Sequence, residues 1–209
     1  MHKTRYEGDR KDLLKLIPHR VSSVLDIGCG EGGLGRLLRE RNSSVKLFAL
    51  EVNEKAASEA ARFYDTVEIC DIQNGSLPFS TEYFDCIVCG DVLEHLYNPW
   101  ETLSILKNHM KLDSLLIVSL PNIRYYRVLR ELILKGNWTY KPSGILDWSH
   151  IRFFTLKEMK KMFDGAGYVI EKTIPVIGGS KDVKKLNKLL FYKLNDFIAK
   201  QYIFVLKCK

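Results

Sequence analysis

Two histidines and two carboxylates of this sequence stand where they can do acid–base or metal chemistry. Asp91, Glu94 and His95 are spaced i, i+3 and i+4 after an apolar run, so in a helix they would share one face. The ordinary pKa of an imidazole suits it to take a proton near neutral pH. The sequence therefore indicates His95 or His150 as a catalytic base, and a purely structural histidine is the alternative for each.

A glycine-rich turn is the strongest local signal. Gly28, Gly30 and Gly33 follow a short apolar run, and glycine lets the main chain turn sharply and lets a ligand approach it closely. Glu51 ends the next apolar run, where a carboxylate can accept both hydroxyl protons of a ribose. Asp71 ends the third run, where it can accept a hydrogen bond from an adenine amino group. This spacing predicts an adenosine-containing cofactor and leaves a nicotinamide dinucleotide open.

Alternating strands and helices are expected to hold these residues at one edge of a sheet. Strands are predicted over 23–27, 46–50, 66–70, 84–89, 115–120, 168–174 and 202–206. Helices are predicted over 34–41, 55–64, 99–110, 126–134, 156–166 and 183–199, with Asn98 and Thr155 as caps of two of them. The alternation predicts a doubly wound α/β fold with a mostly parallel sheet covered on both faces.

Residues 122–150 depart from this alternation. We expect one domain over 1–209, with 122–150 inserted in it as a lid or acceptor-binding segment. Aromatic and arginine side chains can stack on a ring or sugar face and bind a phosphate or carboxylate. The segment's candidates are Arg124, Tyr125, Tyr126, Arg127, Trp138, Tyr140 and Trp148. A lid packed only by its own aromatic residues is the alternative.

The charge of the chain is concentrated near its last residues. Lysine and arginine number 32 against 25 acidic residues, a balance of +7. Eight lysines and two aspartates lie between Lys181 and Lys209. Such a basic face is suited to RNA, to anionic lipid or to an acidic partner, and a merely solvated helix face is the alternative.

The sequence also indicates in which cellular compartment the protein works and what its paired cysteines do. No apolar run approaches the roughly 20 residues of a membrane span, and the first residues carry no apolar signal-peptide core, so we expect a cytoplasmic protein without a membrane span. Cys86 and Cys89 form a CxxC pair. Three positions apart on a strand place two thiols on opposite faces, so we expect both to be core residues and not a metal or redox site.

The sequence resembles the class I S-adenosylmethionine-dependent methyltransferases over nearly its whole length. The matching stretches are 24–32 with its Asp-x-Gly-x-Gly, Glu51, 70–72, 84–96, and 154–155 leading to 165–168. An acid two residues before the first glycine is more similar to this family than to dehydrogenases. The resemblance implies a Rossmann-like sheet of seven strands whose last strand runs antiparallel between the fifth and sixth.

The resemblance also implies which residues contact S-adenosylmethionine. Gly28, Cys29 and Gly30 correspond to the loop against its methionine part, Glu51 to the ribose ligand, and Asp71 with Ile72 to the adenine contacts. The full set of implied cofactor-binding residues is Asp26, Gly28, Cys29, Gly30, Glu51, Val52, Asp71, Ile72 and Gly90.

The acceptor and a metal are the remaining expectations. The segment 119–155 is similar to bacterial methyltransferases of sugars or small cell-envelope precursors, which implies O-methylation of a small sugar-like or polyol acceptor. The set Asp91, Glu94, His95 and His150 resembles the Mg²⁺ or Mn²⁺ site of RNA-terminal ribose methyltransferases and the site of quinone-pathway O-methyltransferases, with Asp91 replacing the usual glutamate. RNA ribose 2′-O-methylation with a divalent metal is therefore the alternative function. The sequence fixes neither the acceptor, nor oxygen against nitrogen, nor the oligomeric state.

Overall fold

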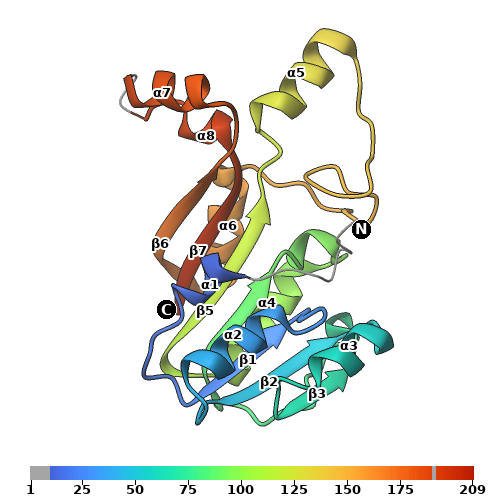
Figure 1. The fold of residues 1–209 in the computed structure, drawn as a ribbon, viewed down its shortest axis with the longest axis vertical. Coiled ribbons are helices and arrows are strands. Elements are labelled where there is room, and N and C mark those ends of the chain that lie inside the picture. Colours follow the sequence, from blue (N-terminus) through green and yellow to red (C-terminus); the bar gives the residue numbers. More distant parts are fainter. Residues whose placement is uncertain (1–9, 190–191) are drawn as a thin grey trace.

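A single twisted sheet forms the centre of the computed structural model, which describes residues 10–189 and 192–209 (Figure 1). Its strands are β1 (Ser23–Ile27), β2 (Lys46–Glu51), β3 (Thr66–Ile69), β4 (Phe84–Gly90), β5 (Met110–Pro121), β6 (Tyr168–Ile177) and β7 (Ala199–Cys208). They lie in the order β3-β2-β1-β4-β5-β7-β6. Only β7 pairs antiparallel with its neighbours, β5 and β6. The predicted seven-stranded sheet with an antiparallel last strand is confirmed.

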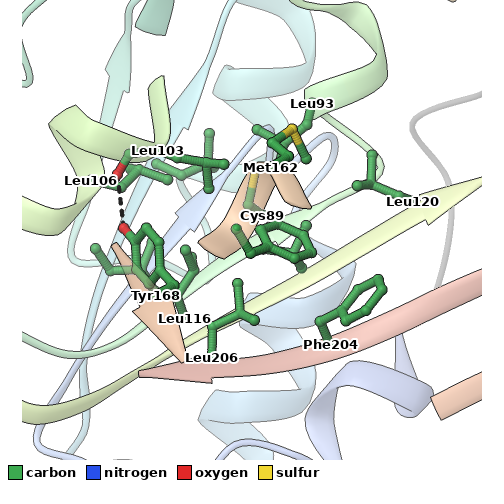
Figure 2. Packing of buried hydrophobic residues seen from close by; sticks show 14 of the residues in the cluster. Cys89, Leu93, Leu103, Leu106, Leu116, Leu120, Met162, Tyr168, Phe204 and Leu206 are labelled. Carbon is green, nitrogen blue, oxygen red and sulfur yellow. Dashed lines mark hydrogen bonds between the residues drawn. The ribbon is translucent and has the colours of Figure 1, made fainter. Parts of the chain in front are cut away.

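Helices cover both faces of this sheet. They are α1 (Lys11–Leu14), α2 (Gly33–Arg41), α3 (Glu54–Ala60), α4 (Pro99–His109), α5 (Tyr126–Lys135), α6 (Leu156–Gly165), α7 (Lys181–Leu189) and α8 (Asn195–Ile198). Two apolar clusters result, one involving α1 and α2, the other involving α4 and α6 (Figure 2). Cys86 belongs to the first and Cys89 to the second, and both are fully buried. The expectation that they are core residues on opposite faces is confirmed.

The capping residues predicted for two helices act as expected. The Asn98 side chain accepts a hydrogen bond from the main-chain N–H of Glu101 at 3.2 Å, with Pro99 as the first residue of α4. The Thr155 hydroxyl accepts one from the N–H of Glu158 at 3.3 Å at the start of α6. Each cap satisfies a donor that has no partner within its helix, which fixes where the helix begins.

Two predicted helices end or break earlier than the sequence pattern indicates. Helix α3 stops at Ala60, because the chain then turns to bury Tyr64 beneath β1. The predicted helix over 183–199 is instead the pair α7 and α8. Tyr192 adopts a left-handed φ of 61° between them, and the Asn187 side chain accepts the main-chain N–H of Leu194 at 3.0 Å. The local turn therefore overrides the helical periodicity.

Helix α5 and the loop after it stand apart from the sheet. Figure 1 shows α5 and the α7–α8 pair at the same end of the molecule, beyond the edge where β5 ends. No residue of α5 is buried. Within the described part of the chain, none of the helices combines the length and apolarity that a bilayer span requires.

The hydroxyl of Tyr168 gives a test of the packing between α4 and β6. It donates a hydrogen bond to the main-chain carbonyl of Leu103 at 2.8 Å inside the cluster drawn in Figure 2, and the side chain is 1% exposed. We expect Tyr168→Phe to lower the free energy of unfolding by about 1 kcal/mol, because one buried hydrogen bond is lost without a change of packing. Urea unfolding measures this, and an unchanged midpoint would contradict it.

Candidate active site

The glycine-rich loop between β1 and α2 has a backbone conformation that favours glycine. Gly28 and Gly30 have left-handed φ values of 69° and 57°. A Cβ placed on Gly28 would lie 2.7 Å from Cγ2 of Val92, so the loop after β1 packs tightly on the loop after β4. The main-chain N–H groups of Gly28 and Cys29 both donate to the carbonyl of Leu50, at 2.8 and 3.2 Å. The loop is thus tied to the end of β2.

The carboxylate of Glu51 completes this attachment. It is 4% exposed; Oε2 accepts the main-chain N–H of Gly30 and Oε1 accepts that of Asn53, each at 2.9 Å. Asn53 in turn caps α3 by accepting the N–H of Ala56 at 3.0 Å. Each carboxylate oxygen has a second lone pair. Glu51 can therefore receive ligand hydroxyls while it holds the loop.

The other predicted cofactor residues lie along the same edge. Asp71 follows β3 and accepts the main-chain N–H of Gln73 at 3.0 Å, which begins the short 3₁₀ helix η1 (Ile72–Asn74). Ile72 is 4% exposed, whereas Val52 is 63% exposed. Gly90 is the last residue of β4. A hollow of about 330 Å³ begins at Asp71 and Ile72 and is lined further by Gln73, Tyr97, Asn98, Glu101, Thr102 and Ile105.

Asp26 lies beneath the loop, on β1, and is 5% exposed. Its carboxyl group accepts a hydrogen bond from the Tyr64 hydroxyl. The tyrosine ring reaches it past Gly35, where a Cβ would lie 2.4 Å from the ring. Burial raises the pKa of Asp26 to about 7, although the Tyr64 hydrogen bond and the charge of Arg10 act to lower it.

A second group of polar side chains lies past the end of β4. Glu94 and His95 come from the 3₁₀ helix η2 (Leu93–His95), and His150 from the end of the segment 122–150. Ligand atoms of these three side chains all lie within 4.8 Å of one another. The two imidazole centroids are 4.6 Å apart, and Nε2 of His150 is 3.9 Å from Oε1 of Glu94. Glu94 is 1% and His150 8% exposed. We call these three residues the His–Glu cluster.

Main-chain carbonyls fix the orientation of both histidines. Nδ1 of His95 donates to the carbonyl of Ser149 at 3.0 Å, and Nδ1 of His150 donates to that of Ile145 at 2.9 Å. Since a carbonyl only accepts, each neutral ring carries its proton on Nδ1, and its Nε2 presents a lone pair. Such an Nε2 can take a proton or bind a metal ion.

The end of the segment 122–150 is clamped onto η2, which brings the cluster together. The carbonyl of Glu94 accepts the N–H groups of Ile151 and Arg152, both at 3.0 Å. The Arg152 guanidinium also donates to the carbonyl of Tyr97 at 3.1 Å. His95 and His150 were predicted separately, and it is this contact between distant parts of the chain that makes them neighbours.

Asp91 lies outside the His–Glu cluster, which corrects the predicted set of four metal ligands. The segment is not an α-helix: η2 is one short turn, and Asp91 has a left-handed φ of 59°. Its carboxylate instead accepts hydrogen bonds from Arg10 at 2.9 Å, from Ser119 at 3.0 Å and from Gln201. The helical spacing that placed Asp91 beside Glu94 therefore does not hold.

Arg10 is a functional candidate that the sequence did not indicate. Its guanidinium donates to Asp91 and, at 3.1 Å, to the Ser119 hydroxyl. Burial disfavours its charged form, but Asp91, Asp12 and Asp26 outweigh this and raise the pKa of Arg10. Arg10 precedes every predicted element and belongs to no motif, so only the folded chain connects it to the edge of β4 and β5.

Residues 2–173 match a family model described as a methyltransferase domain. Among curated proteins, the ubiquinone biosynthesis O-methyltransferase of Glaesserella parasuis is 27% identical over 185 residues, which cover 73% of this chain and 78% of that protein. The bifunctional methionine biosynthesis protein MetXA/MetW of Rhodopirellula baltica is 26% identical over 178 residues. That alignment covers 79% of this chain but only 28% of the relative.

Solved structures agree on the fold. A SAM-dependent methyltransferase from Archaeoglobus fulgidus superposes with a TM-score of 0.68 at 18% identity, covering 94% of this chain and 91% of the other. A possible histamine N-methyltransferase from Thermotoga maritima also gives 0.68, at 17% identity, covering 98% and 89%. Similarity at this level of identity establishes the arrangement of strands and helices.

The raised pKa of Asp26 predicts a pH-dependent stability. Between its ordinary value of 3.8 and about 7, the folded protein holds a proton that the unfolded chain has lost. The free energy of unfolding should therefore fall as pH rises through this range. The variant Asp26→Asn stays neutral and keeps an acceptor for Tyr64. Over the same pH range the free energy of unfolding of the wild type should fall by on the order of a few kcal/mol more than that of the variant. Urea titrations of both proteins from acid to neutral pH measure the difference; parallel profiles would contradict the assignment.

Proposed function

This chain belongs to the methyltransferase domain family and is an S-adenosylmethionine-dependent methyltransferase, and from that premise we propose that it methylates an oxygen of a small sugar-like or polyol acceptor. The observation that carries the proposal is the His–Glu cluster, in which a ring nitrogen of each of two imidazoles and a buried carboxylate oxygen lie within 4.8 Å of one another past the end of β4. An acceptor hydroxyl must lose its proton on methylation, and an amine need not have such a base beside it.

The cofactor supplies a methyl group already activated on a positively charged sulfur. The protein's task is then to align that methyl with the acceptor. The residues at the carboxyl edge fit such a molecule: the left-handed glycines Gly28 and Gly30 give the loop after β1 its sharp turn, and Glu51 offers lone pairs to ribose hydroxyls. Asp71 and Ile72 border a hollow suited to the adenine. Asp26, Cys29, Val52 and Gly90 complete the proposed cofactor-binding set.

The His–Glu cluster supports two roles for its members. His95 or His150 accepts the acceptor's proton at Nε2, while the carbonyls of Ser149 and Ile145 hold the rings in place. Glu94 lies 3.9 Å from Nε2 of His150 and stabilises the imidazolium that results. Both residues are almost fully buried, which strengthens this electrostatic contact.

The same three side chains fit a divalent metal. Two imidazole nitrogens and one carboxylate suit Mn²⁺ better than Mg²⁺, which prefers oxygen ligands only. We therefore propose Mn²⁺ held by Glu94, His95 and His150, and we leave Asp91 out because its carboxylate is bound to Arg10. The ion would lower the pKa of an acceptor hydroxyl.

The relatives support oxygen as the methylated atom. The Glaesserella parasuis protein is named as an O-methyltransferase of ubiquinone biosynthesis. Segment 122–150, our proposed acceptor-binding segment, carries exposed Trp138, Tyr140 and Trp148, which can stack on a ring or a sugar face. RNA ribose methylation is the second candidate, favoured by the exposed lysines near α7 and α8.

Glu51→Ala tests the cofactor site. We expect the affinity for S-adenosylhomocysteine to weaken by roughly 1–3 kcal/mol, because ribose hydroxyls and the N–H of Gly30 lose their acceptor. Isothermal titration calorimetry measures it. Asp113→Ala, a change at an exposed position of β5, is the control and should bind as the wild type does. Equal affinity of Glu51→Ala and wild type would remove Glu51 from the site.

Substitutions in the His–Glu cluster are expected to weaken Mn²⁺ binding and to slow methyl transfer. Glu94→Gln should lower Mn²⁺ affinity at least about tenfold, whereas Asp91→Asn should leave it unchanged. His150→Ala should reduce methyl transfer to catechol or polyol acceptors by about 10²–10⁴-fold while S-adenosylhomocysteine binds normally. Calorimetry measures the Mn²⁺ affinity, and transfer of labelled methyl groups measures the turnover.

Full methyl-transfer activity of His150→Ala would refute its role. A lower Mn²⁺ affinity in Asp91→Asn but not in Glu94→Gln would refute the proposed metal ligands.

A further inference from the structure

The whole net charge of the chain lies in two segments. Residues 122–150 and 178–200 together contain eleven lysines and arginines and four acidic residues, a balance of +7 that equals the balance of the entire sequence. The remaining residues therefore carry no net charge. Positive charge that served only to keep the protein surface solvated would not have to be concentrated in two segments.

Folding brings helix α5 of the first segment and the α7–α8 pair of the second to the same end of the molecule (Figure 1). The Tyr125 ring packs on Gly178, where a Cβ would lie 2.7 Å from its hydroxyl. Arg124 forms an ion pair with Asp196 and lies over the Phe197 ring, 4.4 Å from its centroid. The two segments thus meet at the base of α5, and we call the surface that they form at this end of the molecule the basic end.

Helix α5 gives the basic end an apolar stripe. Val128, Leu129, Leu132 and Ile133 follow an i, i+1, i+4, i+5 pattern, which places them on one side of the helix. Leu132 is 40% and Ile133 72% exposed, and no residue of α5 is buried. In a protein that meets only water, an amphipathic helix packs its apolar side on the core, and α5 does not.

Exposed lysines and arginines lie on α5 and on the α7–α8 pair, together with exposed apolar side chains. Those on or beside α5 are Arg127, Arg130, Lys135 and Lys141, and those on or beside α7 and α8 are Lys185, Lys188, Lys193 and Lys200. Leu189 and Tyr192 are 74% and 57% exposed between the lysines. Helices that lie in a membrane interface typically have apolar side chains flanked by lysine and arginine.

We propose that the basic end is a docking surface for an anionic lipid bilayer. Its lysines and arginines would contact anionic headgroups, and Leu132 and Ile133 would enter the boundary between headgroups and acyl chains. The exposed aliphatic side chains of α5, Leu132 and Ile133, favour a bilayer over RNA, because they cannot stack on bases as the aromatic residues of RNA sites do. Contact is confined to the bilayer surface, since none of the described helices is suited to span it.

The docking surface leads directly to the His–Glu cluster. Segment 122–150, which contributes α5, ends at His150, and its next two residues donate to the carbonyl of Glu94. A molecule lying in the outer part of the bilayer would therefore meet the segment that closes on the cluster.

Co-sedimentation with vesicles tests the proposal. We expect the full chain to sediment with phosphatidylcholine vesicles that contain phosphatidylglycerol, and not with pure phosphatidylcholine. Leu132→Ser/Ile133→Ser removes apolar contact without changing charge and should weaken binding about tenfold or more. Arg130→Glu/Lys188→Glu reverses one positive charge in each segment and should also weaken binding about tenfold or more.

Matched controls separate these effects from general ones. Leu112→Ser changes a leucine that is 94% exposed at the far end of β5, and Lys46→Glu/Lys172→Glu changes net charge by the same amount outside the basic end. Both should bind vesicles as the wild type does, and all variants should keep their cofactor affinity. Failure of the wild type to bind anionic vesicles would overturn the proposal. So would unchanged vesicle binding by Leu132→Ser/Ile133→Ser, or salt-sensitive binding to RNA that exceeds binding to vesicles.

Discussion

The conformation of the catalytic edge depends on the bond between the Glu51 carboxylate and the glycine loop. Left-handed glycines turn the main-chain N–H of Gly30 inward, where it is buried and needs an acceptor. Glu51 provides it, and the loop then sits close enough for Gly28 to pack on Val92. Val92 leads into η2, which carries Glu94 and His95. One carboxylate at the end of β2 thereby sets the relative position of the cofactor cradle and the His–Glu cluster.

Features encoded within a few neighbouring residues could be predicted from the sequence. The glycine loop, the caps Asn98 and Thr155, and the acids at the ends of β2 and β3 each depend on local backbone geometry. The alternation of apolar runs and helices predicted the mostly parallel sheet, whereas the place of the last strand between the fifth and sixth followed from the resemblance to class I methyltransferases. The opposite faces of Cys86 and Cys89 needed only the two-residue period of a strand.

Features that depend on contacts between distant residues could not be predicted. Arg10 donates a hydrogen bond to Asp91 across 81 positions, and Asp91 therefore lies outside the cluster of Glu94, His95 and His150. Helical spacing suggested otherwise because a single 3₁₀ turn and a helix have the same pattern over so short a segment. The break between α7 and α8 likewise arises from Asn187 bonds that no periodicity reveals. The pairing of His95 with His150 required the clamp of Glu94 on Ile151 and Arg152.

The place of β7 in the sheet constrains the order in which the protein can be assembled. Among the described strands, β6 is hydrogen-bonded only to β7, which lies between it and β5. During synthesis, residues 110–121 and 168–177 must therefore wait with exposed strand edges until 199–208 arrive between them. Open edges of this kind are the points at which nascent chains associate wrongly. The antiparallel insertion thus makes the completion of the sheet a late, long-range step in folding.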